Sequence, residues 1–314
     1  MRIVNIGSLN VDFVYDVDHF VQKGETISSK GRSAFAGGKG LNQSIALGRA
    51  GVEVFHAGLV GREGAFLRDL LRDSGVNVEW VREVEDCPSG HAIIQRDAEG
   101  DNCIILYGGA NRMVDEAFVD EVLSSFSPDD WVLLQNETGS LAYAIHAAKD
   151  RGMRVVLNPS PVDNVLLGCP LELVDCFILN EGEAARIVGL DVTRSTPERL
   201  LAAMGERFPR ADTVLTIGSE GSMCRCSGEV FLQTALRVDA VDTTAAGDTF
   251  TGYYLAERAK GHDAPGALRV ASAASAIAVS REGAAPSIPV RSEVEELLGS
   301  AERADSGSLL RAMA

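Results

Sequence analysis

The sequence predicts an α/β fold in which a mostly parallel sheet is sandwiched by helices and carries a small β-hairpin lid. Three observations lead to this prediction. Short apolar runs alternate with amphipathic stretches along most of the 314 residues. Two segments depart from that alternation and have the pattern of hairpins. Polar residues collect where the apolar runs end, which is the edge at which parallel sheets bind ligands.

The apolar runs predict the strands of the sheet. They are residues 3–7, 52–60, 131–136, 154–158, 176–180 and 213–218. Between them, residues 63–75, 114–126 and 141–152 have the apolar spacing of amphipathic helices. Strands that alternate with helices form a parallel sheet covered on both faces. We therefore expect one domain over residues 1–314, with a tail after Ser300 that frays.

Two segments, about 11–36 and 90–110, alternate apolar and polar positions and contain turn signals at Lys23-Gly24 and Glu99-Gly100-Asp101. They predict two hairpins. A small layer of strands above the strand ends would act as a lid that excludes water from a reaction. The same pattern is typical of solvated edge strands or of a dimer surface. A lid that also forms a homodimer agrees with both interpretations.

The bulk composition narrows the class of partner. The net charge of −16 and the pI near 4.8 argue against a nucleic-acid or anionic-membrane surface and favour small molecules. The first residues enter a strand without a signal-peptide pattern, and no run approaches the ~20 apolar residues of a membrane span. We therefore expect a cytoplasmic protein. The cysteines lack zinc spacing and are expected to be reduced core residues: Cys87, Cys103, Cys169, Cys176, Cys224 and Cys226.

The stretch DTTAAGDTF, residues 242–250, predicts a helix N-terminus with a binding role. Gly247 in a first helical turn costs about 1 kcal/mol relative to alanine, which indicates close approach of a ligand to the backbone. The free N–H groups of Ala245, Ala246 and Gly247 form a site for an anion such as phosphate. Asp248 is then explained as the proton acceptor for an attacking hydroxyl. The alternative is an ordinary helix cap with an acidic first turn.

Two further stretches carry polar groups at predicted strand ends. Asn10 and Asp12 lie on one face of an extended segment and suit a vicinal diol, although a turn would use the same residues. Lys39, among glycines and near Asn42, is placed to lie over a phosphate or a hydroxyl. Its surroundings match neither a Walker A loop nor a dinucleotide fingerprint. A plain glycine-rich turn is the alternative there.

Polar residues also follow three later strands. Glu137 comes after residues 131–136, and Asn180 and Glu183 lie at a strand-to-helix junction. This last pair would orient a hydrated magnesium ion or form a capping box, and its spacing alone favours the cap. Residues 216–221, TIGSEG, form either a nucleotide-binding lip or a hairpin turn.

Two long stretches together resemble a known family. GGKGLNQSIALGRAG (37–51) and DTTAAGDTFTGYYLA (242–256) are similar to the two signature stretches of the PfkB carbohydrate kinases, and the similarity extends to ASAIAVSREGAAPSIP (274–289). Within that family the ribokinases are the most similar group. The resemblance implies a ribokinase-like fold and transfer of the γ-phosphoryl group of ATP to a sugar hydroxyl. It also implies that Asp248 is the catalytic base and that Ala245, Ala246 and Gly247 form the anion hole.

The resemblance also assigns binding residues by position. The sugar contacts it implies are Asn10, Asp12, Gly38, Lys39, Asn42, Glu137 and Asp248. The ATP contacts are Asn180, Thr216, Gly218, Ser219, Gly221, Gly247 and Ser272, and the last of these stands where ribokinases carry asparagine. Asn180 and Glu183 match a motif that binds Mg²⁺, expected here through water, which reverses the preference for a plain cap. A monovalent-cation site that takes K⁺ is matched by Asp242, Thr244, Ala278, Arg281, Gly283 and Ser287.

We therefore expect an ATP-dependent sugar kinase that converts D-ribose to ribose 5-phosphate. The lid residues Ile105 and Tyr107 lie where sugar specificity is commonly set in the family. The alternatives are a PfkB kinase for fructose, 2-keto-3-deoxygluconate or adenosine, or a non-catalytic sensor of sugar or nucleotide. A sensor needs no base, so the presence of Asp248 argues against it. A dehydrogenase is the weakest alternative, because no strand is followed by the required glycine spacing.

Overall fold

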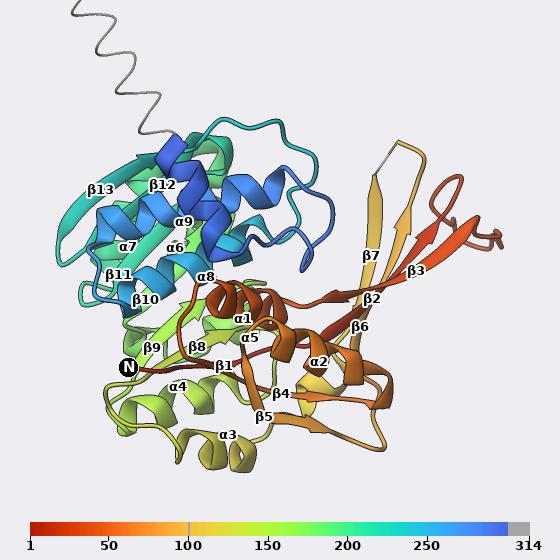
Figure 1. Ribbon diagram of the computed structural model, residues 1–314, viewed down its shortest axis with the longest axis horizontal. Helices are drawn as coiled ribbons and strands as arrows, with labels where there is room; N and C mark the ends of the chain where they lie inside the picture. The colour runs from red at the N-terminus through yellow and green to blue at the C-terminus, as the bar shows by residue number, and fades with distance from the viewer. Residues whose placement is uncertain (100, 301–314) are drawn as a thin grey trace, which may run out of the picture.

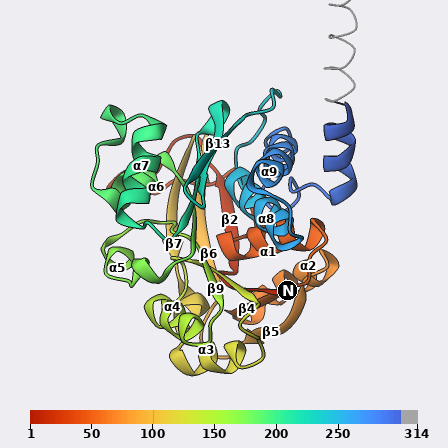
Figure 2. The same ribbon diagram turned by 90° about the vertical axis from the view of Figure 1, so that its left-hand side faces the viewer.

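The computed structural model describes residues 1–99 and 101–300. The segment after Ser300, which the sequence predicts to fray, lies outside the described residues. Figures 1 and 2 show a large sheet between two layers of helices, with a second, smaller sheet projecting from one side. The predicted α/β architecture is confirmed.

Within the described residues the main sheet has nine strands in the order β13-β12-β11-β10-β9-β8-β1-β4-β5. Their bounds are β1 (Ile3–Ile6), β4 (Val54–Val60), β5 (Asn77–Glu83), β8 (Trp131–Gln135), β9 (Arg154–Asn158), β10 (Cys176–Asn180), β11 (Asp212–Thr216), β12 (Gly221–Cys226) and β13 (Glu229–Thr234). The strands from β11 to β5 pair in parallel, and β12 and β13 add an antiparallel edge. All six predicted strands form, and β5, β12 and β13 are additional.

Helices cover both faces of this sheet (Figure 2). One face carries α1 (Lys39–Arg49), α2 (Ala65–Asp73), α8 (Ala246–Ala259) and α9 (Ala264–Val279). The other carries α3 (Glu116–Leu123), α4 (Leu141–Asp150), α5 (Asn164–Leu167), α6 (Glu181–Val188) and α7 (Pro197–Arg207). Residues 291–300 are also helical, and short 3-10 turns are η1 (Arg62–Gly64), η2 (Gly109–Met113), η3 (Leu171–Leu173), η4 (Val192–Arg194) and η5 (Gly218–Glu220). None of the described helices combines the length and apolar character that crossing a bilayer requires.

The core consists of two apolar layers, one on each face of the sheet. Successive residues of a strand point to opposite faces, so Leu133 enters the layer under α1 and α8 while Val132 and Leu134 enter the layer under α3 and α4. Phe177 and Ile178 divide in the same way. Burial of one such side chain contributes about 1.5–3 kcal/mol. Both faces are therefore apolar, which is why the predicted strands read as continuous apolar runs.

The smaller sheet is built from the two predicted hairpins. Its strands, among the described residues, are β2 (Asn10–Asp16), β3 (Gly31–Gly37), β6 (Gly90–Arg96) and β7 (Asn102–Tyr107). The antiparallel pairs β2–β3 and β6–β7 join through parallel pairing of β2 with β6. We call this sheet the β-layer. Figure 1 shows it standing away from the helices at the edge of the main body.

The connections of the chain bring the β-layer to the strand ends of the main sheet. The strand order reverses between β1 and β8, because β4 and β5 lie on one side of β1 and β8 to β11 on the other. A reversal of this kind opens a crevice at the carboxyl ends of the strands. The chain leaves β1 into β2 and returns from β3 directly into α1. Polar residues of β2, α1 and the strand ends therefore meet at one place.

The cysteines are only partly the core residues that the sequence predicts. All six are free thiols, and Cys169, Cys176, Cys224 and Cys226 are buried. Cys103 is exposed and Cys87 is half-buried, so the prediction is wrong for these two. Cys103 lies on β7, whose residues are all exposed, and an apolar context in the sequence does not distinguish this strand from a buried one.

Candidate active site

The predicted helix N-terminus forms, with α8 beginning at Ala246. Its N-cap residue, Ala245, is held at φ 60° and ψ 8°, in the left-handed region that costs a non-glycine residue about 1–2 kcal/mol. Ala246 N donates to Thr243 O at 3.3 Å, and the helical ladder starts with Thr249 N donating to Ala245 O at 2.8 Å. Within the described chain the N–H groups of Ala245, Gly247 and Asp248 lack a backbone acceptor. These three amides, more than that of Ala246, are open to an anion.

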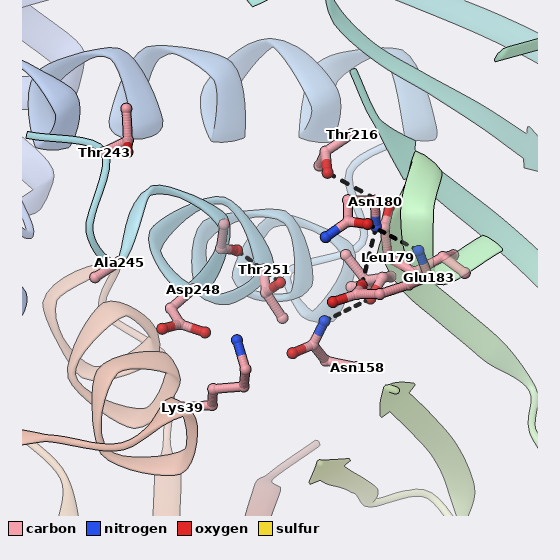
Figure 3. Close-up of a pocket in the computed structure, with 12 residues that line it drawn as sticks. Lys39, Asn158, Leu179, Asn180, Glu183, Thr216, Thr243, Ala245, Asp248 and Thr251 are labelled. Carbon is pink, nitrogen blue, oxygen red and sulfur yellow. Dashed lines mark hydrogen bonds between the residues drawn. The ribbon is translucent and has the colours of Figure 1, made fainter. Parts of the chain in front are cut away.

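A cavity of about 240 Å³ lies in front of this helix start. Figure 3 shows Lys39 and Asp248 extending toward the same space from α1 and α8, with Asn158 beside them and Asn180 and Glu183 across the cavity. Gly247 also lines the cavity, and a β-carbon added to it would have no protein atom within 4 Å. The backbone of α8 is therefore bare on the side that faces the cavity.

Asp248 is buried, with 8% of its surface exposed, and both of its carboxylate oxygens accept hydrogen bonds. Asn42 Nδ2 donates to Oδ2 at 3.0 Å, and Gln43 Nε2 donates to Oδ1 at 2.8 Å. Both donors are neutral amides of α1. They hold the carboxylate in one orientation without the neutralising effect of a contacting cation.

Lys39 supplies the positive charge of the cavity. Burial lowers the pKa of its ammonium group, but the negative charges of Asp248, Glu137 and Glu183 outweigh this effect and raise the pKa above its usual value. The Lys39 backbone N donates to Glu137 Oε2 at 3.1 Å, and the Ser8 hydroxyl donates to the same oxygen. The lysine stays protonated and balances the carboxylates around it.

Asn10 and Asp12 lie at the start of β2, and Asp12 is close enough to Glu137, the acceptor of the Lys39 backbone N–H, to feel its charge. Burial and the charge of Glu137 raise the pKa of Asp12 to about 6. Gly37, which pairs with Asn10 on the neighbouring strand β3, leaves room for this carboxylate, because a β-carbon there would lie 2.1 Å from Asp12 Oδ2. Gly38 is the N-cap of α1, at φ 99°. Asn10 and Asp12 form a polar wall that Glu137 connects to Lys39, and it is suited to a molecule with several hydroxyls.

Asn111 is a site residue that the sequence reasoning missed. It is buried, and Leu9 N donates to its Oδ1 at 2.9 Å, which fixes the orientation of the amide. Its Nδ2 then donates to Asn10 Oδ1 at 2.7 Å. Asn10 is left with its own NH₂ group for a ligand. No spacing signal marks Asn111, because its partners lie more than 100 residues away in the chain.

Gln43, Gln135 and Asn158 were missed as well. All three are buried amides, and Gln43 is hydrogen-bonded to Asp248, to Asn158 and to Gln135. Gln135 and Asn158 are the last residues of β8 and β9. Glu137 and Asn180 were selected because polar groups at strand ends mark a site. The same rule applies to Gln135 and Asn158.

A second cavity, of about 730 Å³, adjoins the first and shares with it Asn180, Thr216, Thr243 and Gly247. Its volume is within the range of small-molecule pockets. The apolar side chains of its wall are Leu236, Val238, Phe250, Ala276 and Val279. All the residues predicted for ATP line it: Asn180, Thr216, Gly218, Ser219, Gly221, Gly247 and Ser272. The structure thus brings together seven residues from four separate segments.

Asn180 and Glu183 form the capping box that their spacing alone favours. Glu183 N donates to Asn180 Oδ1 at 2.9 Å, and Asn180 N donates to Glu183 Oε2 at 3.0 Å. Both residues also line the smaller cavity. The described residues contain no cluster of three His, Cys, Asp or Glu side chains that would hold a metal ion. The donor set fits Mg²⁺ only if the ion keeps most of its waters.

The residues matched to a monovalent-cation site are partly in contact. Asp242 Oδ1 accepts from Thr244 N at 2.8 Å, and Asp242 Oδ2 accepts from Gly283 N at 2.9 Å. The Ala278 carbonyl accepts from Arg281 N at 3.1 Å, while the Arg281 guanidinium pairs with Glu293. The Ser287 hydroxyl donates to Ala284 O. A carboxylate and backbone carbonyls of two adjacent loops are a suitable oxygen set for K⁺.

The lid residues Ile105 and Tyr107 lie away from both cavities. Each is on β7, with 60% and 49% of its surface exposed. Ile104 and Leu106, on the same strand, are exposed to a similar extent. In the described structure this strand presents an apolar surface to solvent and not to the site.

Comparison with known proteins agrees with this geometry. Residues 1–291 match the pfkB family of carbohydrate kinases. Ribokinase from Haemophilus influenzae is 32% identical over 297 residues, which are 93% of this chain and 97% of that protein. The ribokinase of Cryptococcus neoformans var. grubii serotype A, solved in complex with ADP, superposes with a TM-score of 0.84 at 31% identity and covers 94% of this chain and 99% of its own. Arabidopsis thaliana ribokinase, solved with ribose and ATP, has a TM-score of 0.82 at 30% identity and covers 95% and 98%. The chain is a member of the PfkB family of carbohydrate kinases.

Proposed function

We propose that this kinase transfers the γ-phosphoryl group of ATP to D-ribose and forms ribose 5-phosphate. One observation carries the proposal. The Asp248 carboxylate, the bare start of α8 and Lys39 line one small cavity, and this cavity adjoins a larger one of the size that a nucleotide needs. The ribokinase relatives support ribose as the acceptor, and the Arabidopsis enzyme was solved with ribose and ATP.

In this proposal ATP lies in the larger cavity, with its terminal phosphate in the smaller one. Asp248 accepts the proton of the ribose O5 hydroxyl as that oxygen attacks the γ-phosphorus. The N–H groups of Ala245, Gly247 and Asp248, the α8 dipole and Lys39 stabilise the charge on the transferring phosphoryl oxygens. Asn10, Asp12, Gly38, Asn42 and Glu137 hold the sugar hydroxyls so that O5 points at the phosphorus.

Two cations belong to the proposal. Asn180 and Glu183 would hold Mg²⁺ through water, and Glu183 Oε1 is the oxygen that the capping box does not use. When bound, Mg²⁺ supplies positive charge that neutralises phosphate oxygens. Asp242, Thr244, Ala278, Arg281, Gly283 and Ser287 would hold K⁺ behind the α8 amides, where its charge strengthens their field.

We also propose that the β-layer acts as the lid of the site and as the homodimer contact. The lid segments are those of residues 11–36 and 90–110, within a single domain. The apolar exposure of Ile104, Ile105, Leu106 and Tyr107 on β7 supports a contact with a second copy, because surface patches of this kind mark interaction sites. A cytoplasmic location agrees with six free thiols and with ATP as the substrate.

The proposed function is tested by coupled measurement of ADP release with ribose, fructose and adenosine at fixed ATP, with and without K⁺. We expect ribose to give the highest kcat/KM, by about tenfold or more over either alternative, which is the discrimination that 1–2 kcal/mol of pocket contacts provides. Preference for adenosine would make the chain a nucleoside kinase. Calorimetric binding of ribose and ATP without ADP release would make it a sensor.

The raised pKa of Asp12 predicts how activity depends on pH. Ionised Asp12 accepts hydrogen bonds from sugar hydroxyls with both carboxylate oxygens, whereas the protonated form carries an O–H donor on one of them, so kcat/KM for ribose is expected to fall below pH 6, by up to about tenfold per pH unit. Above pH 6, kcat/KM is expected not to change with pH through this group. Bound hydroxyls stabilise the carboxylate and lower its pKa in the complex, so kcat at saturating ribose falls only at lower pH.

Asp12→Asn provides the control for that pH profile. It is expected to lower kcat/KM at pH 7.5 and to remove the limb near pH 6. If the limb stays at the same pH in Asp12→Asn, another group controls it and the assignment to Asp12 is wrong.

Asn111→Asp tests how Asn10 meets the sugar. Leu9 N keeps one carboxylate oxygen of the new side chain, and the other faces Asn10 as an acceptor. The Asn10 amide must then flip and present oxygen, not NH₂, to the ligand. We expect KM for ribose to rise about tenfold, the effect of one mispaired hydrogen bond of 1–2 kcal/mol, with kcat little changed. An unchanged KM would show that Asn10 makes no oriented contact with the sugar.

A further inference from the structure

A continuous row of buried polar side chains runs behind Asp248, away from both cavities. It contains Asn5, Gln43, Ser44, His56 and Gln135, and each of these is 0% exposed. They come from β1, α1, β4 and β8. Polar groups this deeply buried are costly, and Gln135 Oε1 and His56 Nε2 are left without a hydrogen-bond partner, so the row indicates a purpose other than packing.

The contacts of the row lead step by step from the carboxylate into the core. Gln43 Nε2 donates to Asp248 Oδ1 at 2.8 Å and to Asn158 Oδ1 at 3.0 Å. Gln43 Oε1 accepts from Gln135 Nε2 at 2.7 Å. Gln135 Nε2 also donates to Asn5 Oδ1 at 3.0 Å. Both amide hydrogens of Gln43 and of Gln135 are therefore in use.

The row continues from Asn5 to a buried imidazole. Asn5 Nδ2 donates to Ser44 Oγ at 2.8 Å, and Ser44 Oγ lies 2.8 Å from His56 Nδ1. Burial lowers the pKa of His56 to about 3, so the ring is neutral at pH 7. Because Ser44 Oγ accepts from Asn5, its own hydrogen is available for His56 Nδ1. The far end of the row carries no charge.

The direction of every bond in the row follows from the ionised state of Asp248. A carboxylate only accepts hydrogen bonds, so Gln43 must present its NH₂ group. Its carbonyl oxygen then faces Gln135, which must present its own NH₂ group in turn. A flip of the Gln43 amide would place its carbonyl oxygen against the Asp248 carboxylate and its NH₂ group against the NH₂ group of Gln135. The row permits one orientation of Gln43 and thereby one position of Asp248 Oδ1.

We propose that Gln43 is a positioning residue for the phosphoryl transfer, which holds the Asp248 carboxylate in its reactive orientation and is itself held by Gln135. The inference rests on the proposed function, in which Asp248 is the base. Asn42, the other donor to Asp248, is assigned to the sugar in the proposed function and would be shared with it. Gln43 is covered by protein on all sides, so its contact persists in every state of the site.

The charged groups near Asp248 determine what loss of Gln43 does. Lys39 on α1 faces it across the smaller cavity, with Glu137 after β8 and Glu183 on α6 around the lysine. His56 at the end of the row is neutral. Removing a donor from the ionised carboxylate disfavours that form, so the acid limb of kcat moves to higher pH. A change that only loosens the fold leaves the limb in place.

Gln43→Met and Gln43→Glu are the variants that test this inference. Gln43→Met keeps the approximate shape of the side chain and removes the hydrogen-bond donor. We expect kcat at pH 7 to fall about 10- to 100-fold, which is part of the contribution of a positioned base. KM for ATP should stay within threefold of the unsubstituted enzyme. Gln43→Glu sets a second carboxyl beside Asp248, and the two share a proton at neutral pH. Its kcat is expected to be low at pH 7 and below and to recover as the pH rises toward 9.

Asn136→Ala is the matched control. Asn136 is also a buried amide, next to Gln135 in the chain, but it donates to Pro161 O at 2.7 Å and to Asp163 Oδ1 at 3.0 Å, outside the row. We expect a lower melting temperature with an unchanged pH profile. If Gln43→Met, folded by circular dichroism, shows the kcat and acid limb of this control, the inference is wrong.

Two arms keep the result decisive. If Gln43→Met does not fold, the recovery of Gln43→Glu at high pH and the kcat of Gln135→Met decide the result. Gln135→Met frees Gln43 to flip. It is expected to lower kcat about 3- to 10-fold, which is less than the effect of losing the donor itself. Absence of both effects overturns the inference. Asp248→Asn is measured alongside. If it retains turnover, the proposed base is wrong; if it is inactive while the Gln43 variants match the control, only the role of Gln43 is wrong.

Discussion

Asp248→Asn is expected to lower kcat by about 10²- to 10⁴-fold, the usual contribution of a positioned general base, with ATP affinity nearly unchanged. The amide that replaces the carboxylate has the same size and remains between Asn42 and Gln43. It cannot accept a proton from the sugar hydroxyl at neutral pH. In the proposed binding mode ATP lies mainly in the larger cavity, which Asp248 does not line. Steady-state ADP release and calorimetric titration with ATP measure the two effects separately.

Asp130→Asn separates catalysis from stability in that experiment. Burial raises the pKa of Asp130, but hydrogen bonds from Arg2 and Ser127 outweigh it and bring the pKa to about 2. A pKa below that of the unfolded chain stabilises the fold at pH values above about 4, and this contribution is lost as the pH falls through 2. Asp130→Asn should therefore cost about 2 kcal/mol of stability at pH 7 without lowering kcat. Comparable kcat in the two variants would remove Asp248 from the mechanism.

The main sheet was predictable because its signal is local. Strands buried on both faces, such as β8 and β10, read as unbroken apolar runs. The edge strand β5 was not predicted, since Asn77 and Glu79 face solvent and interrupt its apolar pattern. The β12–β13 edge follows the turn at Gly221. The sequence predicts either a nucleotide-binding lip or a hairpin turn at this position. In the structure Gly221 both lines the larger cavity and begins β12.

Site residues were predictable where their position next to a helix start or a strand end marks them in the sequence. Asp248 marks a helix start, and Glu137 and Asn180 follow strands. The structure places all three at the two cavities or in contact with Lys39. Asn180 and Glu183 were also predictable as a capping box, because that pairing needs only a spacing of three.

The buried residues that support Asp248 were not predictable from the sequence. Gln43 and Asp248 are 205 positions apart, and Gln43 and Gln135 are 92 apart. Residues 40–47 of α1 are buried on every side, so no apolar stripe shows which face of the helix meets α8. Only the packing of α1 between the sheet and α8 reveals that Gln43 faces the carboxylate and not the core.

Gly247→Ala is expected to make the enzyme slightly more stable and much less active. Alanine is favoured over glycine in a helix by up to about 1 kcal/mol, and a β-carbon at this position would meet no protein atom within 4 Å. Gly247 lines both cavities, at the amide that we assign to the migrating phosphoryl group. An added methyl group there displaces the phosphate, and a displacement of 1 Å is enough to reduce catalysis about 10²-fold.

The combination of effects is what makes this variant informative. A substitution that harms the fold lowers the melting temperature and kcat/KM together, whereas Gly247→Ala should raise the first and lower the second. Gly168→Ala is the matched control, because Gly168 is exposed at the end of α5, away from both cavities, and its β-carbon would make only ordinary contacts. We expect that control to keep its kcat/KM for ATP. If Gly247→Ala keeps it too, phosphate does not approach the start of α8, and the nucleotide must bind in a different position.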